Sequence, residues 1–82
     1  MKTIHHPDYR KLIGWLTAER KFKKMDQTAV SEAMGWPNHT LLSKTERLER
    51  KLDVLEFVQL CKVLEVDPKE GIEILTQEKP TI

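Results

Sequence analysis

Apolar residues recur at helical spacing along most of the chain, and β-branched runs are absent. The first such segment covers residues from about 7 to 21, with Pro7 in the first turn, where a missing N–H costs nothing. Its apolar positions follow the spacing i, i+3, i+4, i+7 that places side chains on one helical face. This predicts a first helix whose inward face is Tyr9, Leu12, Ile13 and Leu16.

Two short helical segments follow and are separated by a tight corner, Gly-Trp-Pro-Asn at 35–38. Asp26 suits the N-cap of the second helix, and Gly35 suits its end, where glycine adopts the left-handed backbone at little cost. Asn38 can then cap the third helix. The expected inward faces are Ala29, Val30, Ala33 and Met34 on the second helix and Leu41, Leu42 and Thr45 on the third.

The last two predicted helices begin with acidic caps. Asp53 and Glu56 have the spacing of a capping box, and Asp67, Pro68 and Glu70 repeat the device. The apolar positions expected to face inward are Val54, Leu55, Val58, Cys61 and Leu64 on the fourth helix and Ile72 and Leu75 on the fifth.

These patterns predict an all-α fold, a single compact five-helix domain over residues 1–82 with a core of about 7–76 and a frayed tail at 77–82. The composition, 39% hydrophobic and 33% charged, is that of an ordinary soluble domain. The chain shows neither a membrane-length apolar run nor an apolar signal segment near its first residues, which favours the cytoplasm. With Cys61 as its one cysteine, the chain has no disulfide framework and no Cys-based metal site.

The net charge of +1 conceals an asymmetry between the two parts of the chain. Residues 1–51 carry 11 Lys/Arg and 6 Asp/Glu, a net +5, whereas residues 52–82 carry 3 and 7, a net −4. A basic first part favours an anionic partner there, although lysine-rich faces are often simply solvated.

Several motifs agree in residue type and spacing over about residues 9–76. They are "QTAVSEAMG" from Gln27, "LSKTERLERKLDVLEFVQLCKVLEVDP" from Leu42, and Arg20 placed seven residues before Gln27. The chain resembles the Cro/lambda-repressor type of helix-turn-helix, the XRE family. The resemblance implies a lambda-repressor-like DNA-binding domain whose second and third helices form the helix-turn-helix.

The resemblance also assigns roles to individual residues. The recognition helix inserts its first residues into the major groove, where each base pair displays a distinct pattern of donors and acceptors. The base-contacting set is then Asn38, His39, Thr40, Ser43 and Lys44. The resemblance also assigns a phosphate contact to Gln27. Arg47, Arg50 and Lys51 follow the recognition helix and are placed to neutralise phosphates, and Trp36 in the corner is included as a candidate backbone contact. A structural ion pair between Arg20 and Glu46 is expected to orient the recognition helix.

Two features depart from the family pattern. Gly35 and Glu46 are eleven residues apart where the family usually has ten, so the extra residue lies either in the turn, with Asn38 as the cap, or in a bulge of the third helix. Leu48 stands where the family often has a glycine, and it either fills a core gap or a dimer gap. Trp36 in the corner either covers the gap between helices or lies against the DNA backbone.

The function expected from these features is sequence-specific binding of double-stranded DNA by a small transcriptional regulator or repressor. Dimerisation on a palindromic operator is expected through the fourth and fifth helices, because the length leaves no room for a separate dimerisation domain. The alternative is a protein–protein interaction module that retains the helix-turn-helix fold. His5, His6 and His39 form no cluster with metal spacing, so we expect no enzyme, no catalytic residue, no metal, no cofactor, no membrane contact and no small-molecule ligand.

Overall fold

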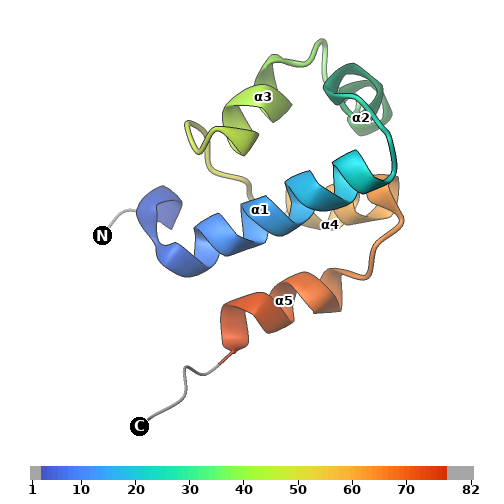
Figure 1. The fold of residues 1–82 in the computed structure, drawn as a ribbon. Helices are drawn as coiled ribbons and strands as arrows, with labels where there is room; N and C mark the ends of the chain where they lie inside the picture. Colours follow the sequence, from blue (N-terminus) through green and yellow to red (C-terminus); the bar gives the residue numbers. More distant parts are fainter. Residues whose placement is uncertain (1–2, 78–82) are drawn as a thin grey trace, which may run out of the picture.

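Residues 3–77, the part of the chain that the computed structural model describes, form five α-helices and no strand (Figure 1). This confirms the predicted all-α architecture. A short 3-10 turn, η1 (Thr3–His5), precedes α1 (Pro7–Phe22), α2 (Gln27–Met34), α3 (Thr40–Glu46), α4 (Val54–Leu64) and α5 (Pro68–Thr76). Residues 78–82 of the tail expected to fray lie outside the described residues.

The longest helix, α1, runs through the middle of the molecule (Figure 1). The pair α2–α3 lies on one side of it and α5 on the opposite side, while α4 crosses behind it. α1 therefore contacts α3, α4 and α5, and α2 packs on α3 and α4. The helix-turn-helix is held on a platform of α1 and α4, at the opposite end of the molecule from α5.

The predicted helix starts are present with their caps. Asp26 Oδ1 accepts a hydrogen bond from Ala29 N at 2.7 Å. Asp53 and Glu56 form the full capping box, with bonds of 2.7 and 3.1 Å between each side chain and the other residue's backbone N–H. Asp67 caps α5 through Lys69 N at 2.9 Å. Local side chain to backbone bonds of this kind are why these helices begin at the predicted positions.

Four helices end in the same way. At each end a residue adopts the left-handed backbone conformation. Its N–H and the next N–H donate to carbonyls in the last turn of the helix, which is the Schellman motif. Only one of the four residues is a glycine: they are Lys24, Gly35, Leu48 and Glu65, with φ between 57° and 78°. Leu48 therefore occupies the left-handed position itself, and its side chain packs against the core.

The predicted inward face of α1 is confirmed, since all four of its apolar residues are buried. On α3, Leu42 and Thr45 are buried and Leu41 is half-buried. The core itself consists of Tyr9, Leu12, Ile13, Leu16, Val30, Leu42, Leu52, Phe57, Leu60, Cys61 and Leu64.

The predicted inward faces of α2 and α4 were partly wrong. On α2, Ala29 and Ala33 are exposed, whereas Ser31 is buried beside Val30, and Met34 is half-buried. Small side chains such as alanine bury little apolar area, so they place little constraint on which face of a short helix packs inward.

On α4, Val54 and Leu55 are 80% and 66% exposed, and Val58 is half-buried. The buried positions are Phe57, Leu60, Cys61 and Leu64, which share the spacing i, i+3, i+4, i+7. The helix carries two overlapping apolar stripes, and packing on α1 buries the one that contains the large Phe57 ring.

The prediction that Ile72 and Leu75 face inward was also wrong, because they are 47% and 38% exposed. Gly71 is the residue of α5 that is buried. A Cβ at Gly71 would lie 2.8 Å from Phe57 Cζ, 2.9 Å from Trp15 Cζ3 and 3.0 Å from Leu12 Cδ1. α5 therefore approaches α1 and α4 through a position without a side chain, which leaves its larger apolar residues outside.

Within residues 3–77, every helix is too short or too polar to span a lipid bilayer.

Candidate nucleic-acid interface

The structure places the extra residue of the corner in the turn. α3 is uninterrupted from Thr40 to Glu46, so it contains no bulge. Asn38 Oδ1 accepts a hydrogen bond from Thr40 N at 2.9 Å, and the carbonyl of His39 accepts the bond from Ser43 N that opens the helix. The corner thus extends from Trp36 to His39. His39, one residue after the predicted Asn38, holds the N-cap position, and the Asn38 side chain caps the first N–H of the helix from the position before it.

The predicted base-contacting residues lie at the start and on the outer side of α3. Asn38, His39, Thr40 and Lys44 are exposed, and Ser43 is half-buried. The opposite side of α3 is occupied by Leu42 and Thr45, 2% and 1% exposed, which pack into the core. The short helix therefore keeps its polar residues on a surface that a partner can reach.

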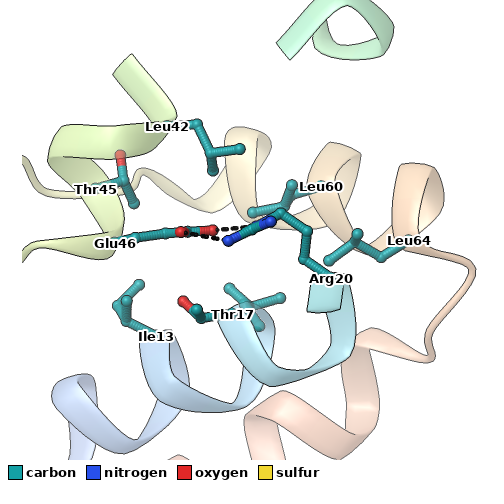
Figure 2. Close-up of a pocket in the computed structure, with 9 residues that line it drawn as sticks. Ile13, Thr17, Arg20, Leu42, Thr45, Glu46, Leu60 and Leu64 are labelled. Atoms are coloured by element: carbon teal, nitrogen blue, oxygen red, sulfur yellow. Dashed lines mark hydrogen bonds and ion pairs between the residues drawn. The ribbon is translucent and has the colours of Figure 1, made fainter. Parts of the chain in front are cut away.

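Arg20 and Glu46 join the end of α1 to the end of α3. Arg20 Nε lies 2.7 Å from Glu46 Oε2 and Arg20 Nη2 lies 3.0 Å from Glu46 Oε1, the two-pronged geometry that guanidinium and carboxylate favour (Figure 2). The third arm, Arg20 Nη1, donates to the carbonyl of Met25 at 2.9 Å. The side chains are only 11% and 13% exposed, so the pair is shielded from bulk water.

The space beneath this ion pair is filled. Figure 2 shows Ile13 and Thr17 rising from α1 below the pair and Leu42 lying above it. The remaining cavity has a volume of about 10 Å³, no more than one water molecule needs. The angle between α3 and α1 is therefore set by directional bonds over a packed core.

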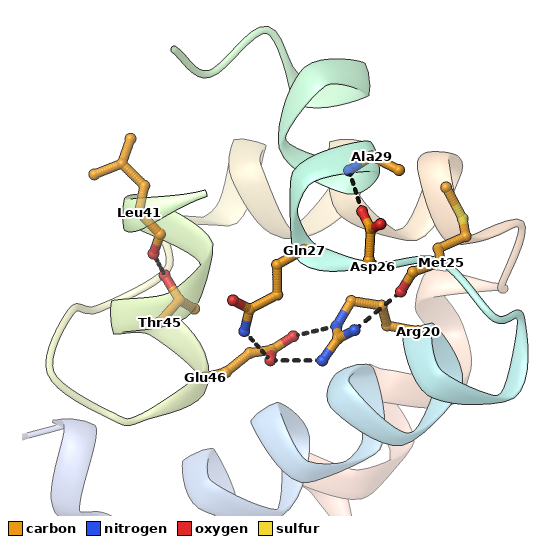
Figure 3. A network of polar contacts seen from close by, with 8 residues as sticks. All are labelled: Arg20, Met25, Asp26, Gln27, Ala29, Leu41, Thr45 and Glu46. Carbon is orange, nitrogen blue, oxygen red and sulfur yellow. Dashed lines mark hydrogen bonds and ion pairs between the residues drawn. The ribbon is translucent and has the colours of Figure 1, made fainter. Parts of the chain in front are cut away.

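Gln27, predicted to contact a phosphate, belongs to the same network (Figure 3). Its Nε2 donates to Glu46 Oε1 at 2.8 Å, so α2 is bonded to the end of α3 as well. A primary amide carries two N–H donors, and one remains for an outside acceptor. The sequence indicated the residue, but the contact with Glu46 depends on a fold that brings positions 27 and 46 together.

Trp36 and Arg50 meet between the corner and the segment after α3. Trp36 is half-buried against the core, and the Arg50 guanidinium lies 5.5 Å from the centre of its ring, a cation–π distance. Arg50 Nη2 also pairs with Glu56 Oε2 at 2.5 Å, and Nη1 lies 3.4 Å from Thr45 Oγ1. The structure thus engages Arg50, a predicted phosphate contact, in bonds within the chain.

Glu56 was missed as a site residue. One of its carboxylate oxygens closes the capping box of α4 and the other pairs with Arg50, so the start of α4 is tied to the segment after α3. The sequence indicated only the first of these roles. Arg50 and Glu56 do not belong to the same helix, so no helical spacing predicts their ion pair.

Arg47 and Lys51 lie on the surface near the end of α3. Arg47 pairs with Glu49 at 2.5 Å and also donates to Ser43 Oγ. The hydrogen bond that Arg47 donates to Glu49 holds the pKa of the Glu49 carboxyl below its ordinary value of 4.5. Lys51 takes part in none of the ion pairs found within residues 3–77.

Two observations concern the side chains that could bind a metal or act as a nucleophile. No group of three His, Cys, Asp or Glu side chains between Thr3 and Gln77 lies close enough to hold a metal ion. Cys61 is fully buried, and this burial, helped by the charge of Asp67, raises the pKa of its thiol to about 11. A thiol that stays protonated at neutral pH is a poor nucleophile.

No protein-family model matches the chain, and a search of curated proteins finds no match. Among solved structures, the chain is similar to an XRE-family like protein from Pseudomonas syringae pv. tomato str. DC3000. The two are 34% identical over 90% of this chain and 89% of that one, and they superpose with a TM-score of 0.80.

Proposed function

Because the chain belongs to the XRE family of helix-turn-helix DNA-binding proteins, we propose that it recognises a specific double-stranded DNA sequence and represses transcription there as a homodimer on a palindromic operator. The observation that carries this proposal is the arrangement of α3. A buried polar network anchors its last residue, and its first residues stand exposed with polar side chains.

The exposed start of α3 has the chemistry to read base edges. Lys44 can donate to guanine O6 and N7, and the methyl group of Thr40 can contact a thymine methyl. His39 donates or accepts according to its tautomer. Asn38 uses its oxygen as the helix cap, which leaves its NH₂ group for a base acceptor.

Phosphate contacts would hold this helix in register without reading sequence. We assign this role to Gln27, as the family resemblance implies, and to Trp36, Arg47, Arg50 and Lys51 from their places in the corner and after the recognition helix. Arg47 and Lys51 fit it best, because both are exposed beside the end of α3. Arg50 would have to exchange its contacts with Glu56 and Trp36 for a phosphate.

The surface of α4 and α5 supports dimerisation. A groove of about 200 Å³ lies between α4, α5 and α1, with Tyr9, Leu12 and Phe57 among its apolar lining. Val54, Ile72 and Leu75 border the groove and are 80%, 47% and 38% exposed. Exposed apolar side chains gathered at one place are a mark of an interface. A dimer formed there would read a palindrome if its two recognition helices lay about 34 Å apart.

Selection of bound sequences from a random pool of DNA duplexes tests the proposal. We expect a palindromic consensus with two half-sites one helical turn apart. Lys44→Ala should relax the preference at one position of each half-site. A consensus without symmetry would contradict the dimer and leave the DNA binding in place.

The salt dependence of DNA affinity distinguishes the proposed function from the alternative, a protein–protein interaction module. Binding to mixed-sequence DNA should weaken steeply between low and physiological salt, because phosphate contacts release counterions. If the protein binds no DNA even at low salt, the DNA proposal is wrong and the alternative is favoured. As a DNA-binding repressor the protein would act in the cytoplasm, associated with the nucleoid if its source is bacterial.

A further inference from the structure

A second, open groove runs along α1, with charged side chains at its border. Its volume is about 580 Å³, and it ends at Leu48, directly after the end of α3. Three cations line it, Arg10, Lys11 and Lys21, together with Ile13, Gly14, Thr17, Ala18, Glu46 and Leu48. We call these three cations and the surface between them the α1 groove.

The charge of the α1 groove is unbalanced. Arg10, Lys11 and Lys21 are exposed, and none of them takes part in the ion pairs found within residues 3–77. The carboxylate that lines the groove is Glu46, whose charge is already matched by Arg20. In contrast, Arg47 and Arg50, the arginines after α3, both have a glutamate partner. Within residues 3–77, the positive charge beside the end of α3 that has no ion-pair partner thus lies on these three side chains of α1 and on Lys44 and Lys51.

The shape of the α1 groove suits an extended anion. Arg10 and Lys21 are eleven residues apart in the helix, a distance of about 16 Å along its axis. Consecutive phosphates of one DNA strand are farther apart than the roughly 3.4 Å that each adds along the helix axis, because the strand winds around that axis. This length therefore spans a few phosphates. Gly14 lies between the cations, and no atom stands within 4 Å of the position that its Cβ would take. The centre of the groove is therefore open to a close approach.

The α1 groove is continuous with the anchor of α3. It shares Ile13, Thr17 and Glu46 with the lining beneath the Arg20–Glu46 pair, which Figure 2 shows between α1 and α3. Because Glu46 and Leu48 also line it, the α1 groove adjoins the end of α3. We propose that the α1 groove holds the phosphate backbone just outside the half-site that α3 reads. This inference rests on the proposed function and adds to it a sequence-independent contact with flanking DNA.

The test replaces Lys11 and Lys21 by Gln together and measures affinity for the selected operator at several salt concentrations. Each duplex is used with flanks of about one helical turn and with the flanks trimmed to the half-sites. The matched control is Lys62→Gln with Lys69→Gln, which removes the same charge from exposed positions of α4 and α5. Thermal unfolding of both double variants is compared with that of the original protein.

Loss of two phosphate contacts should lower the slope of log affinity against log salt by about 1.8, at about 0.9 for each contact. The original protein and the control should bind the flanked duplex more tightly than the trimmed one, and the groove variant should bind both alike. Its selected consensus should be unchanged, because phosphates carry no sequence information.

Three results overturn the inference. One is an unchanged salt slope and flank dependence in the groove variant, while Lys44→Ala still impairs operator binding; this leaves the proposed function standing. Another is an equal loss in the control, which would reveal a general effect of net charge. The last is failure of the original protein to bind any DNA, which overturns the proposed function as well.

Discussion

The helices at the two ends of the molecule, α3 and α5, are attached to α1 by different kinds of contact. α3 packs on the core through Leu42 and Thr45. Its last residue, Glu46, also accepts charged hydrogen bonds from Arg20 of α1 and Gln27 of α2, at 2.7 to 3.0 Å. α5 is held by close apolar packing at Gly71, without any side chain of its own at the contact point. Directional bonds define the orientation of a helix more tightly than apolar contact does, because their strength falls steeply with angle.

The surfaces that remain exposed differ in the same way. α3 presents polar side chains from Asn38 to Lys44, which suit the edges of bases. α5 presents Ile72 and Leu75 beside Val54 of α4, which suit a second protein surface. The proposed recognition helix, α3, is thus anchored by directional bonds, whereas α5, which carries part of the proposed dimer surface, is attached by apolar packing. Four substitutions test this difference between α3 and α5.

Arg20→Ala should have the largest effect on stability. It leaves the Glu46 carboxylate shielded from water without its charged partner, and breaking such a pair costs about 3 kcal/mol of unfolding free energy. Chemical denaturation followed by circular dichroism measures the change. Arg47→Ala is the matched control, because its ion pair is more than half exposed and should leave the unfolding midpoint nearly unchanged. Equal effects of the two variants would contradict the anchoring role of Arg20.

Trp36→Ala should destabilise the protein by about 2 kcal/mol, since a half-buried indole and its contact with Arg50 are lost together. Phe22→Ala removes an aromatic ring that is 79% exposed and should have little effect. Trp36→Ala also distinguishes the two interpretations of Trp36, which either covers the gap between helices or lies against the DNA backbone. Loss of stability indicates packing, whereas loss of DNA affinity with unchanged unfolding indicates a contact with the DNA backbone.

Gly71→Ala should lower the free energy of unfolding by about 1 kcal/mol. The added methyl group overpacks the contact with Phe57, Trp15 and Leu12, at a cost of about 1–3 kcal/mol, and better helix propensity returns about 1 kcal/mol. Gly14→Ala is the matched control within a helix. Its Cβ meets open space, so it should stabilise the protein by roughly 0.5–1 kcal/mol. Thermal unfolding in which the midpoint of Gly71→Ala rises as that of Gly14→Ala does would contradict close packing at Gly71.

Val54→Gln should change the stability least, by less than about 0.5 kcal/mol, because the side chain is 80% exposed. It should nevertheless weaken self-association if the groove between α4 and α5 is the dimer surface. Sedimentation equilibrium over a range of concentrations measures this. Phe22→Gln, which changes an exposed apolar residue at the far end of α1, should leave association unaltered. Unchanged association of the Val54 variant would contradict the dimer surface.

Much of the fold could be predicted because its signals are local. Asp26, Asp53 and Asp67 bond to backbone groups two or three residues further on, so the helix starts follow from neighbouring residues alone. The end of α2 at Gly35 follows in the same way from the left-handed conformation that glycine tolerates. The end of α3 could not be read in this manner, because Leu48 takes that conformation against its own preference while its side chain packs on the core.

For the candidate site, the sequence and its family resemblance placed Arg20 opposite Glu46, and in the structure these side chains are bonded. The assignments of Gln27 and Arg50 described only part of their surroundings. Gln27 bonds to Glu46, and Arg50 bonds to Glu56 beside the Trp36 ring. These partners become visible only when the path of the chain between the helices is known.

By itself, the sequence determined the number of helices, their starts, the buried face of α1 and the polar character of the residues around the start of α3. Each of these depends on side chains within about one or two helical turns of one another. The tertiary structure decided which stripe of α4 is buried, that α5 is attached through Gly71, and that free cations gather on α1 beside the end of α3. These features depend on contacts between distant segments, where the size of Phe57 and the pairing of Arg47 and Arg50 with nearby glutamates outweigh any local pattern.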